Sequence, residues 1–312
     1  MDRRTSVLSR GLRRVAGRWR RRLIRALPPH PAIDREIVRW EFRKNVGRDP
    51  DLENATRFTD KIQRRKLFDR NPLLPILQDK WRARDYVARR VGASYLVPCL
   101  DAADRPEAID LGALPERYVA KANHGCGWNL FVGPEAPADP AAVRRTMAAW
   151  LKADFYRRHR EWAYRDIPPV VMIEERIRDN AGGPFPADYK FLCFDGVPRH
   201  LHVFRNRGTP EFCAGRFLID GRRLVPIDYI VVQGGGRTVP LDSRNLDRRR
   251  IDEMIDVARE LCRGIDHIRV DLYDSGDRIL FGEMTLYHSS GFLVYEPDEI
   301  DHRIGAWWNQ TY

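Results

Sequence analysis

Four polar side chains stand inside two apolar segments near the end of the sequence. Arg269 and Asp271 are two residues apart in one segment, and Glu283 and Thr285 are two residues apart in the next. Because side chains alternate across a β-strand, each pair should share one face of its strand. A buried carboxylate is costly unless it is paired or binds a cation, so Asp271 and Glu283 need partners. Magnesium, which proteins hold with one or two carboxylates and phosphate oxygens, would satisfy both.

A simpler interpretation is an ion pair between Arg269 and one of these two carboxylates on the surface of a sheet. A hairpin whose turn is centred on residues 275–276 places residue 280 opposite Asp271. Glu283 would then lie about three residues, on the order of 10 Å, beyond Asp271. A bulge could close this gap, or the two carboxylates could bind two bridged metals.

A glycine-bearing loop follows another short apolar segment. Lys121 stands at the end of that segment, and residues 123–129 contain Gly125 and Gly127. An ammonium in this position can reach phosphate oxygens while backbone N–H groups of the loop surround them. The loop is not a P-loop, because GxxxxGK[ST] occurs nowhere in the chain.

Two acidic residues follow the apolar run 170–173. Glu174 and Glu175 should lie where this buried strand ends. They could accept a hydrogen bond from a ribose hydroxyl or lie beside the edge of an adenine. Solvated carboxylates at a strand end are the alternative.

Both helices and strands are expected to position these residues, and this mixture, with its hairpins, predicts the α+β class. Helical patterns occupy 34–91, with predicted breaks at Asn71-Pro72 and Leu74-Pro75. Within this region, residues 80–91 form one amphipathic helix. Further helices are predicted over 140–160 and 248–263. The strands are expected at 117–122 and 170–173, in a hairpin over 188–204 that turns at Asp195-Gly196, and in a hairpin over 268–285.

The net charge of +11 is concentrated in one segment. Residues 1–29 contain ten arginines and one aspartate, so the tail carries +9 and the remaining 283 residues carry only +2. A body so close to neutral argues against nucleic-acid binding, which needs many phosphate contacts. Leu8, Leu12, Val15, Trp19 and Leu23 lie on one helical stripe, so the tail is either a helix on an anionic membrane surface or a solvated basic leader.

The sequence contains neither a transmembrane-length apolar run nor a secretory signal, so we expect a cytoplasmic protein, with peripheral contact to the inner face of the membrane through residues 1–29 as an option. The scattered cysteines include no pair at metal-ligand or redox spacing, which fits a reducing compartment. His200 and His202 could bind a metal from one strand face, but no third ligand is close in sequence, so ordinary strand residues are the alternative.

A long, ordered set of motifs resembles the TupA-like family of the ATP-grasp superfamily, named for teichuronopeptide biosynthesis. The similarity covers about residues 57–305, and no single short motif carries it. Its segments are Asp60-Lys61-Ile62-Gln63, Leu67 to Pro72, Asp79-Lys80, Tyr95 to Pro98, Ala120 to Gly127, Ile173-Glu174-Glu175, Asp188-Tyr189-Lys190-Phe191, Arg269 to Tyr273, Phe281 to Thr285, and Ser290-Gly291.

The resemblance implies an ATP-grasp fold, in which two α+β lobes clamp ATP, preceded by a helical N-terminal region. The parts implied are a basic tail (1–30), the helical region (31–116), a small lobe with the glycine loop (117–187) and a C-terminal lobe with the magnesium-binding hairpin (188–312). The implied ATP-binding residues are Lys80, Lys121, Gly125, Gly127, Glu174, Glu175, Asp188 and Lys190.

The resemblance also implies roles in chemistry. Asp271, Glu283 and Thr285 would bind Mg²⁺, although many ATP-grasp ligases have asparagine where Thr285 stands. Arg269 would stabilise charge on the transferring phosphoryl group, together with Lys121. His124 and His288 are candidate substrate or proton-transfer residues, with capping or packing roles as the alternative.

The function implied is an ADP-forming carboxylate–amine ligase. ATP would phosphorylate a small-molecule, glycan or peptide carboxylate, and an amine would then displace phosphate, in a step of cell-envelope polysaccharide or peptide modification. One alternative is a kinase that phosphorylates a sugar or glycan hydroxyl. The other is a non-catalytic scaffold that uses the arginine tail on a membrane.

Overall fold

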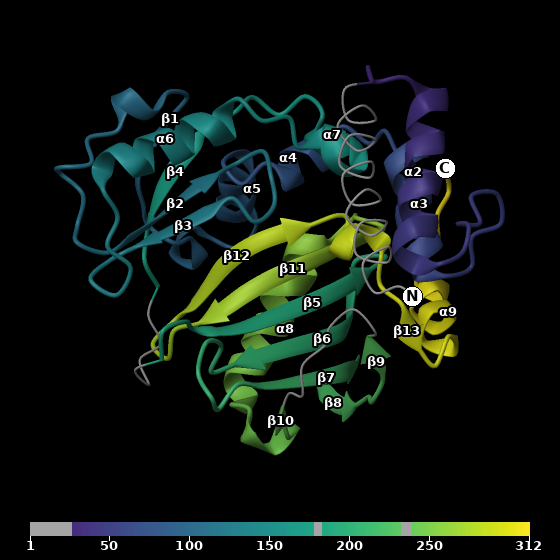
Figure 1. Cartoon of the computed structure of the whole chain (residues 1–312). Coiled ribbons are helices and arrows are strands. Elements are labelled where there is room, and N and C mark those ends of the chain that lie inside the picture. The colour runs from purple at the N-terminus through teal and green to yellow at the C-terminus, as the bar shows by residue number, and fades with distance from the viewer. Residues whose placement is uncertain (1–26, 178–182, 232–238) are drawn as a thin grey trace, which may run out of the picture.

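The computed structural model describes residues 27–177, 183–231 and 239–312, and Figure 1 shows two sheets arranged one above the other. The small sheet has the strand order β1-β4-β2-β3, and the large sheet has the order β10-β7-β6-β5-β11-β12 with β8 beside β7. The strands of the small sheet are β1 (Cys99–Ala103), β2 (Tyr118–Ala122), β3 (Asn129–Val132) and β4 (Val171–Glu175). The large sheet consists of β5 (Ala187–Phe194), β6 (Val197–Arg205), β7 (Cys213–Asp220), β8 (Arg223–Pro226), β10 (Val239–Pro240), β11 (His267–Asp274) and β12 (Ile279–Thr285).

Each sheet has one apolar face covered by a helix. In the small sheet, Tyr118, Ala120 and Ile173 pack toward α6 (Pro140–Leu151), which buries Val143 and Met147. In the large sheet, β5, β6 and β11 pack against α8 (Arg248–Cys262), which lies behind the sheet in Figure 1. Since side chains alternate along a strand, the opposite faces of both sheets carry the polar residues. Those two faces point toward the space between the sheets.

The hairpins that hold the site form where the sequence predicts them. Strands β5 and β6 turn at Asp195 and Gly196, whose φ angles of 48° and 74° are the positive values that a two-residue hairpin turn requires. Strands β11 and β12 pair antiparallel as predicted, but Asp274 faces Ile279, so the turn is centred between residues 276 and 277 and not on 275–276. The amphipathic helix expected at 248–263 is α8, and it begins at Asp247, whose carboxylate accepts from the backbone N–H groups of Arg249 and Arg250.

Helices from the N-terminal third flank both sheets. They are α2 (Pro31–Val46), α3 (Phe58–Phe68), α4 (Leu73–Gln78) and α5 (Arg82–Arg90). The predicted helix break at Asn71-Pro72 is confirmed, but Pro75 lies inside α4. This proline is tolerated because the first turn of a helix needs no N–H donor there.

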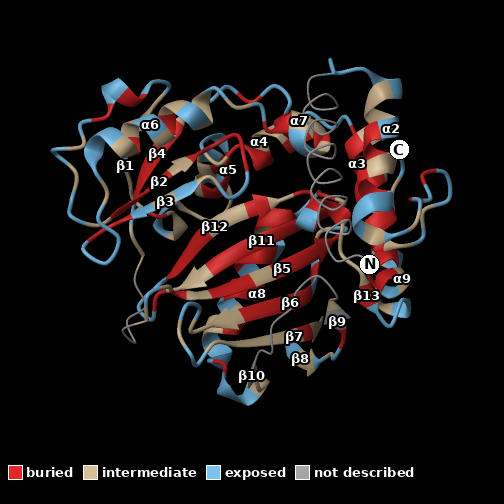
Figure 2. Cartoon of the chain, viewed as in Figure 1, coloured by how far each residue is buried: buried red, intermediate tan, exposed pale blue. Residues whose placement is uncertain are grey.

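The remaining elements complete the C-terminal side. Figure 1 shows α9 (Glu299–Ala306) near α3, and the two are in contact. The strands β9 (Ile230–Val231) and β13 (Tyr295–Glu296) form a separate pair. The red strands in the centre of Figure 2 mark the core between the large sheet and α8, with Phe191, Val270 and Ile255 fully buried.

Two sequence expectations differ from the fold. Strand β1 lies within the region predicted to be helical, and it pairs with β4, so the small sheet begins before residue 117. The helix predicted over 140–160 ends at Leu151, and a separate short helix, α7 (Tyr156–His159), follows. The amphipathic stripe of the tail lies in residues 1–26, outside the described residues. Among the described helices, none combines the length and the apolar character that a membrane span requires.

Candidate functional site

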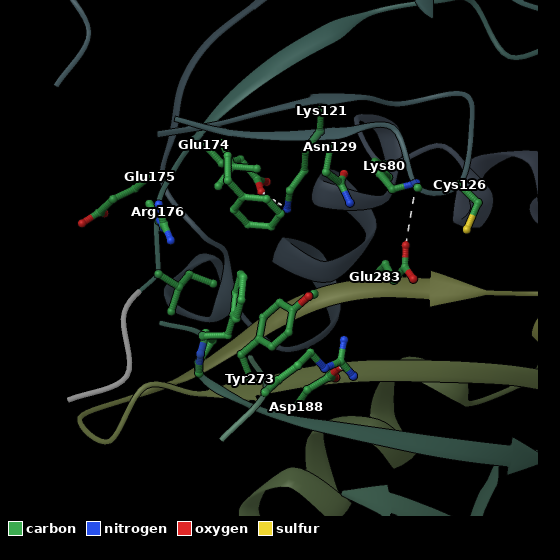
Figure 3. A pocket seen from close by; sticks show the side chains of 18 of the residues that line it. Lys80, Lys121, Cys126, Asn129, Glu174, Glu175, Arg176, Asp188, Tyr273 and Glu283 are labelled. Carbon is green, nitrogen blue, oxygen red and sulfur yellow. Dashed lines mark hydrogen bonds and ion pairs between the residues drawn. The ribbon is translucent and has the colours of Figure 1, made fainter. Parts of the chain in front are cut away.

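A pocket of about 470 Å³ lies between the polar faces of the two sheets. Figure 3 shows Lys121, Asn129 and Glu174 on its small-sheet side and Tyr273, Asp188 and Glu283 on its large-sheet side. Nine charged side chains line it, five basic and four acidic: Lys80, Lys121, Arg176, Lys190 and Arg207, and Glu174, Glu175, Asp188 and Glu283.

Three residues face one another across three strands of the large sheet, and the outer two, Lys190 and Glu283, line the pocket. Lys190 on β5 is paired with Asp271 on β11, and Asp271 is paired with Glu283 on β12. With the observed turn, in which Asp274 faces Ile279, a regular hairpin would have placed Gly282 opposite Asp271 and Glu283 one residue beyond it. Instead the pairing shifts after Asp271, so that Leu272 faces Phe281 and Gly282 is the extra residue of a β-bulge. The bulge brings the two carboxylate-bearing residues directly opposite each other.

Glycine is required at the bulge because the space for a side chain is absent. A Cβ at Gly282 would lie 2.8 Å from Tyr273 Cε2 and 3.1 Å from the backbone oxygen of Asp271. Both distances are shorter than ordinary van der Waals contact. Because Gly282 has no side chain, the aromatic ring of Tyr273 can pack against it and line the pocket beside Glu283.

Arg269 joins the two carboxylates. Its guanidinium donates to both oxygens of Asp271, at 2.6 and 2.7 Å, and to Glu283 Oε1 at 3.2 Å. Burial alone would raise the pKa of Asp271, but the positive charges of Arg269 and Lys190 outweigh burial and hold that pKa below its usual value. Asp271 is therefore a carboxylate anion throughout the physiological pH range, as a magnesium ligand must be.

Lys190 links the acidic row to Asp188. Its ammonium lies 2.5 Å from Asp271 Oδ2 and 2.9 Å from Asp188 Oδ2. Arg207 contacts the same Asp188 oxygen at 3.2 Å, whereas Asp188 Oδ1 is buried without a hydrogen-bond partner in the described part of the chain. Burial raises the pKa of Asp188, with Lys190 opposing this effect.

On the facing sheet, Lys121 is held by an acidic partner. Lys121 Nζ lies 2.5 Å from Glu174 Oε2, and Arg84 Nη1 lies 3.0 Å from Glu174 Oε1. Each oxygen of Glu174 therefore has a cationic partner, and the carboxylate orients Lys121. Glu175 also borders the pocket, but Figure 3 shows its carboxylate pointing away from the other labelled side chains.

Lys80 connects the glycine loop to the large sheet. Its ammonium donates to the carbonyl oxygen of Gly125 at 2.6 Å and lies 3.7 Å from Glu283 Oε2; Figure 3 marks the second contact. Gly127 lines the pocket in a left-handed conformation, with φ 74°. Gly125 instead packs under Trp128, whose ring atoms would lie as close as 2.4 Å to an added Cβ.

Five predicted site residues are absent from the pocket lining. Arg269 and Asp271 are buried next to the lining residue Glu283. The other three are Gly125, Thr285 and His124. His124 is buried, its Nδ1 contacts Asn123 Oδ1 and its Nε2 contacts the carbonyl oxygen of Trp150, both at 3.0 Å. Its place in the structure supports a packing role and gives no contact with the acidic row. Thr285 stays near that row, with Oγ1 3.5 Å from Glu283 Oε1.

Several lining residues had no clear signal in the sequence. Asn129 and Phe131 face the pocket because they share the strand face of Lys121, so alternation along β3 could have identified them. Phe185 meets Phe131 edge to face at 5.4 Å. Arg84 and Arg207 come from a distant helix and a loop, and no spacing connects them to Glu174 or Asp188.

The donor set fits one kind of metal site. Within the described residues no cluster of three or more His, Cys, Asp or Glu side chains could hold a metal alone. Asp271 and Glu283 are two carboxylates on adjacent strands, which suits Mg²⁺ that takes its other ligands from phosphate and water. His200 and His202 are buried beside each other, and no third such ligand joins them among the described residues, which favours the alternative of ordinary strand residues.

Comparison with protein families decides the family. A family model described as "TupA-like ATPgrasp" matches residues 60–309. The chain belongs to the TupA-like ATP-grasp family. The two sheets that enclose the pocket are therefore the lobes of an ATP-grasp fold, and the resemblance noted in the sequence is confirmed.

Solved structures similar to this TupA-like chain are distant. The ATP-grasp ligase PsnB with a precursor variant, Mg and ADP is 12% identical, with TM-score 0.39, over 69% of this chain and 52% of that one. D-alanine–D-alanine ligase from Bacillus anthracis with ATP is 14% identical, with TM-score 0.39, over 68% and 55%. D-cycloserine synthetase DcsG is 17% identical, with TM-score 0.39, over 69% and 64%. The chain thus spans less than two thirds of each of these proteins. No curated protein matched it.

Proposed function

We propose that this TupA-like protein is an ATP-dependent, ADP-forming ligase that joins a carboxylate to an amine. The observation that supports the proposal is the acidic pair Asp271 and Glu283, which Arg269 bridges. Glu283 lines the same pocket as Lys121 and Lys80. Carboxylates that can hold a metal, together with arginine and lysine side chains, are the kinds of groups that stabilise phosphoryl transfer from ATP.

In this proposal the nucleotide phosphates lie between the two sheets. Lys121 and Lys80 would contact phosphate oxygens from one side, and Asp271 with Glu283 would hold Mg²⁺ on the other, with Thr285 close to Glu283. Bound magnesium would neutralise phosphate charge. Glu174 keeps Lys121 extended into the pocket, and the apolar rings of Phe131 and Phe185 surround the base end.

The proposed reaction has two steps. A substrate carboxylate oxygen forms a bond to the γ-phosphorus while the bond to the β-bridging oxygen breaks, which gives an acyl phosphate and ADP. The nitrogen of an amine then bonds to the acyl carbon, inorganic phosphate leaves, and the nitrogen loses a proton. Arg269 stabilises the charge that spreads over the γ-phosphoryl oxygens. Lys80 ties the 123–129 loop to Glu283 and so restricts water, which would hydrolyse the acyl phosphate.

The experiment is an ADP-release assay of the full chain with ATP, Mg²⁺ and pools of amino acids and uronic acids. Hydroxylamine serves as a general amine, because it converts any acyl phosphate into a hydroxamate. We expect ADP and hydroxamate in equal amounts, both lost in Glu283→Gln. A stable phosphoester detected by mass spectrometry, with no hydroxamate, would contradict the ligase and identify a kinase.

Glu283→Gln is preferred over Asp271→Asn as the inactive variant. Asp271 is 1% exposed and balances two cations, so its neutralisation would leave buried charges unpaired and lower stability by about 3–5 kcal/mol. Glu283 is partly exposed, so its amide should preserve the fold.

A further inference from the structure

The guanidinium of Arg269 has four of its five N–H groups assigned to protein acceptors. Nε and Nη2 donate to Asp271, Nη2 also donates to Glu283, and Nη1 lies 3.0 Å from His288 Nδ1. An arginine side chain offers five N–H groups and no acceptor. One Nη1 N–H therefore remains without a partner among the described residues, and its direction is fixed by the other four.

His288 must act as an acceptor in this contact. Since a guanidinium can only donate, Nδ1 of His288 carries a lone pair and the ring proton lies on Nε2. Burial, with the nearby charge of Arg269, holds the pKa of His288 well below its usual value, so the ring is neutral. The contact therefore orients Arg269 without adding charge.

The backbone after His288 has an unusual conformation. Ser289, Ser290 and Gly291 have φ angles of 48°, 55° and 68°, which gives three successive left-handed residues, two of them non-glycine. Such residues persist only where the surrounding structure holds them. A Cβ at Gly291 would lie 2.3 Å from Gln63 Nε2, so the turn is packed tightly on α3.

A buried lysine holds this turn. Lys66 Nζ donates to the carbonyl oxygen and to the hydroxyl of Ser290, both at 2.8 Å, and to Gln63 Oε1 at 3.0 Å. Gln63 Nε2 donates to the carbonyl oxygen of Ser290 at 3.0 Å. A desolvated ammonium is costly to bury, so its use on one turn indicates that the position of this turn matters.

We propose that His288 is a positioning residue that fixes the plane of Arg269, so that the remaining Nη1 N–H meets the γ-phosphoryl group, and that Lys66 holds His288 in place through the turn Ser289–Gly291. The role of Arg269 toward a phosphoryl group rests on the proposed function. The contact between His288 and Arg269 is observed in the structure and is independent of the proposed function.

The binding test compares ADP with its β,γ-imido triphosphate analogue, each with Mg²⁺, by calorimetry on the full chain. The ratio of the two dissociation constants measures how strongly the protein contacts the γ-phosphate. We expect His288→Leu to reduce this preference for the triphosphate about five- to tenfold, with ADP affinity unchanged within about twofold. His288→Asn, which restores an acceptor near Nδ1, should recover most of the preference.

A matched control and a coupled variant sharpen the test. His200 is also a buried histidine, but neither ring nitrogen has a partner in the described part of the chain, so His200→Leu should leave both affinities unchanged. Lys66→Met should reduce the triphosphate preference in the wild-type background and have no further effect on His288→Leu. Thermal unfolding of every variant identifies any that have lost the fold.

Equal losses in His288→Leu and His288→Asn, or a preference retained in His288→Leu, would overturn the proposal. If the wild type binds neither nucleotide, the proposed function fails, and NMR then tests the positioning alone. Rotation of the ¹⁵N-labelled Arg269 guanidinium, identified with Arg269→Lys, should be slow in the ligand-free wild type and fast in His288→Leu. Equal rates in both proteins would reject the inference.

Discussion

Lys190 Nζ lies 2.5 Å from Asp271 Oδ2, so a protein cation already contacts the carboxylate at the centre of the acidic row. Arg269 contacts the same oxygen and also Oδ1. A divalent ion that binds Asp271 must therefore displace Lys190 and Arg269 or share the carboxylate with them. Nucleotide phosphates offer both side chains new partners, which makes metal binding dependent on nucleotide.

Divalent binding without nucleotide should accordingly be weak. Replacing the cation in Lys190→Met should strengthen binding of Mn²⁺ alone about three- to tenfold, because one competing positive charge is removed. Electron paramagnetic resonance of free Mn²⁺ measures this directly. Lys152→Met, on an exposed residue of α6's C-terminal end, is the control and should change nothing. Equal Mn²⁺ affinities in Lys190→Met and the wild type would show that Lys190 does not compete with the metal.

The β-bulge at Gly282 predicts a position-specific defect. Gly282→Ala should force Tyr273 or the backbone of Asp271 to move, with a loss of about 1–3 kcal/mol in the free energy of unfolding and at least tenfold weaker binding of Mg²⁺ with ATP. Denaturant unfolding and calorimetry measure the two effects. The control Gly112→Ala meets only the side chain of Asp110, at 3.3 Å, and should be neutral. Unchanged nucleotide affinity in Gly282→Ala would mean that the bulge is not needed for the site.

The two adjacent glutamates on β4 should behave differently. Glu174→Gln removes the charge that holds Lys121 and Arg84, so we expect about five- to thirtyfold weaker ATP binding. Glu175→Gln alters a side chain that points away from the pocket residues and should have less than a twofold effect. Calorimetry with ATP and Mg²⁺ compares them. The reverse order of effects would assign the ligand contact to Glu175.

Lys66 gives the stability of the protein a distinct pH dependence. Burial lowers the pKa of Lys66 to about 8, whereas the unfolded chain keeps it near 10.4. Between these values the unfolded state binds more protons, so the contribution of Lys66 to stability should rise with pH, by up to about 1.4 kcal/mol per pH unit. Below pH 8 both states are protonated and this dependence disappears.

The measurement is the difference in unfolding free energy between the wild type and Lys66→Met at pH 7, 8 and 9.5. The difference isolates Lys66 from other groups that titrate in the same range, such as the cysteines. The unfolding free energy of the wild type should increase relative to that of Lys66→Met between pH 8 and 9.5. If this difference is constant with pH, or decreases as pH rises, a buried ammonium at this position is contradicted.

Sequence spacing predicted the elements of the site well. The alternation of Arg269 with Asp271 and of Glu283 with Thr285 placed each pair on one strand face, and the turn residues Asp195 and Gly196 located the hairpin of β5 and β6. Such local patterns are reliable because they follow from the geometry of a single strand or turn.

The relation between distant strands was not readable in the same way. Counting residues around a turn centred on 275–276 gave an offset of three residues, about 10 Å, between Asp271 and Glu283. The turn is in fact centred one residue later, which removes two residues of this offset, and the bulge at Gly282 removes the third. Strand β1 was missed because its irregular burial gives no alternating pattern. The ion pair between Arg84 and Glu174 depends on how α5 packs against the small sheet, and no local sequence pattern predicts that packing.

The most direct test of the account is the location of a metal in crystals grown with Mn²⁺ and the β,γ-imido analogue of ATP. Anomalous scattering should show Mn²⁺ within coordination distance of Asp271 and Glu283, about 2.2 Å from an oxygen of each, with the triphosphate between them and Lys121. A Mn²⁺ peak that contacts neither carboxylate, or a nucleotide bound outside the pocket, would contradict the account.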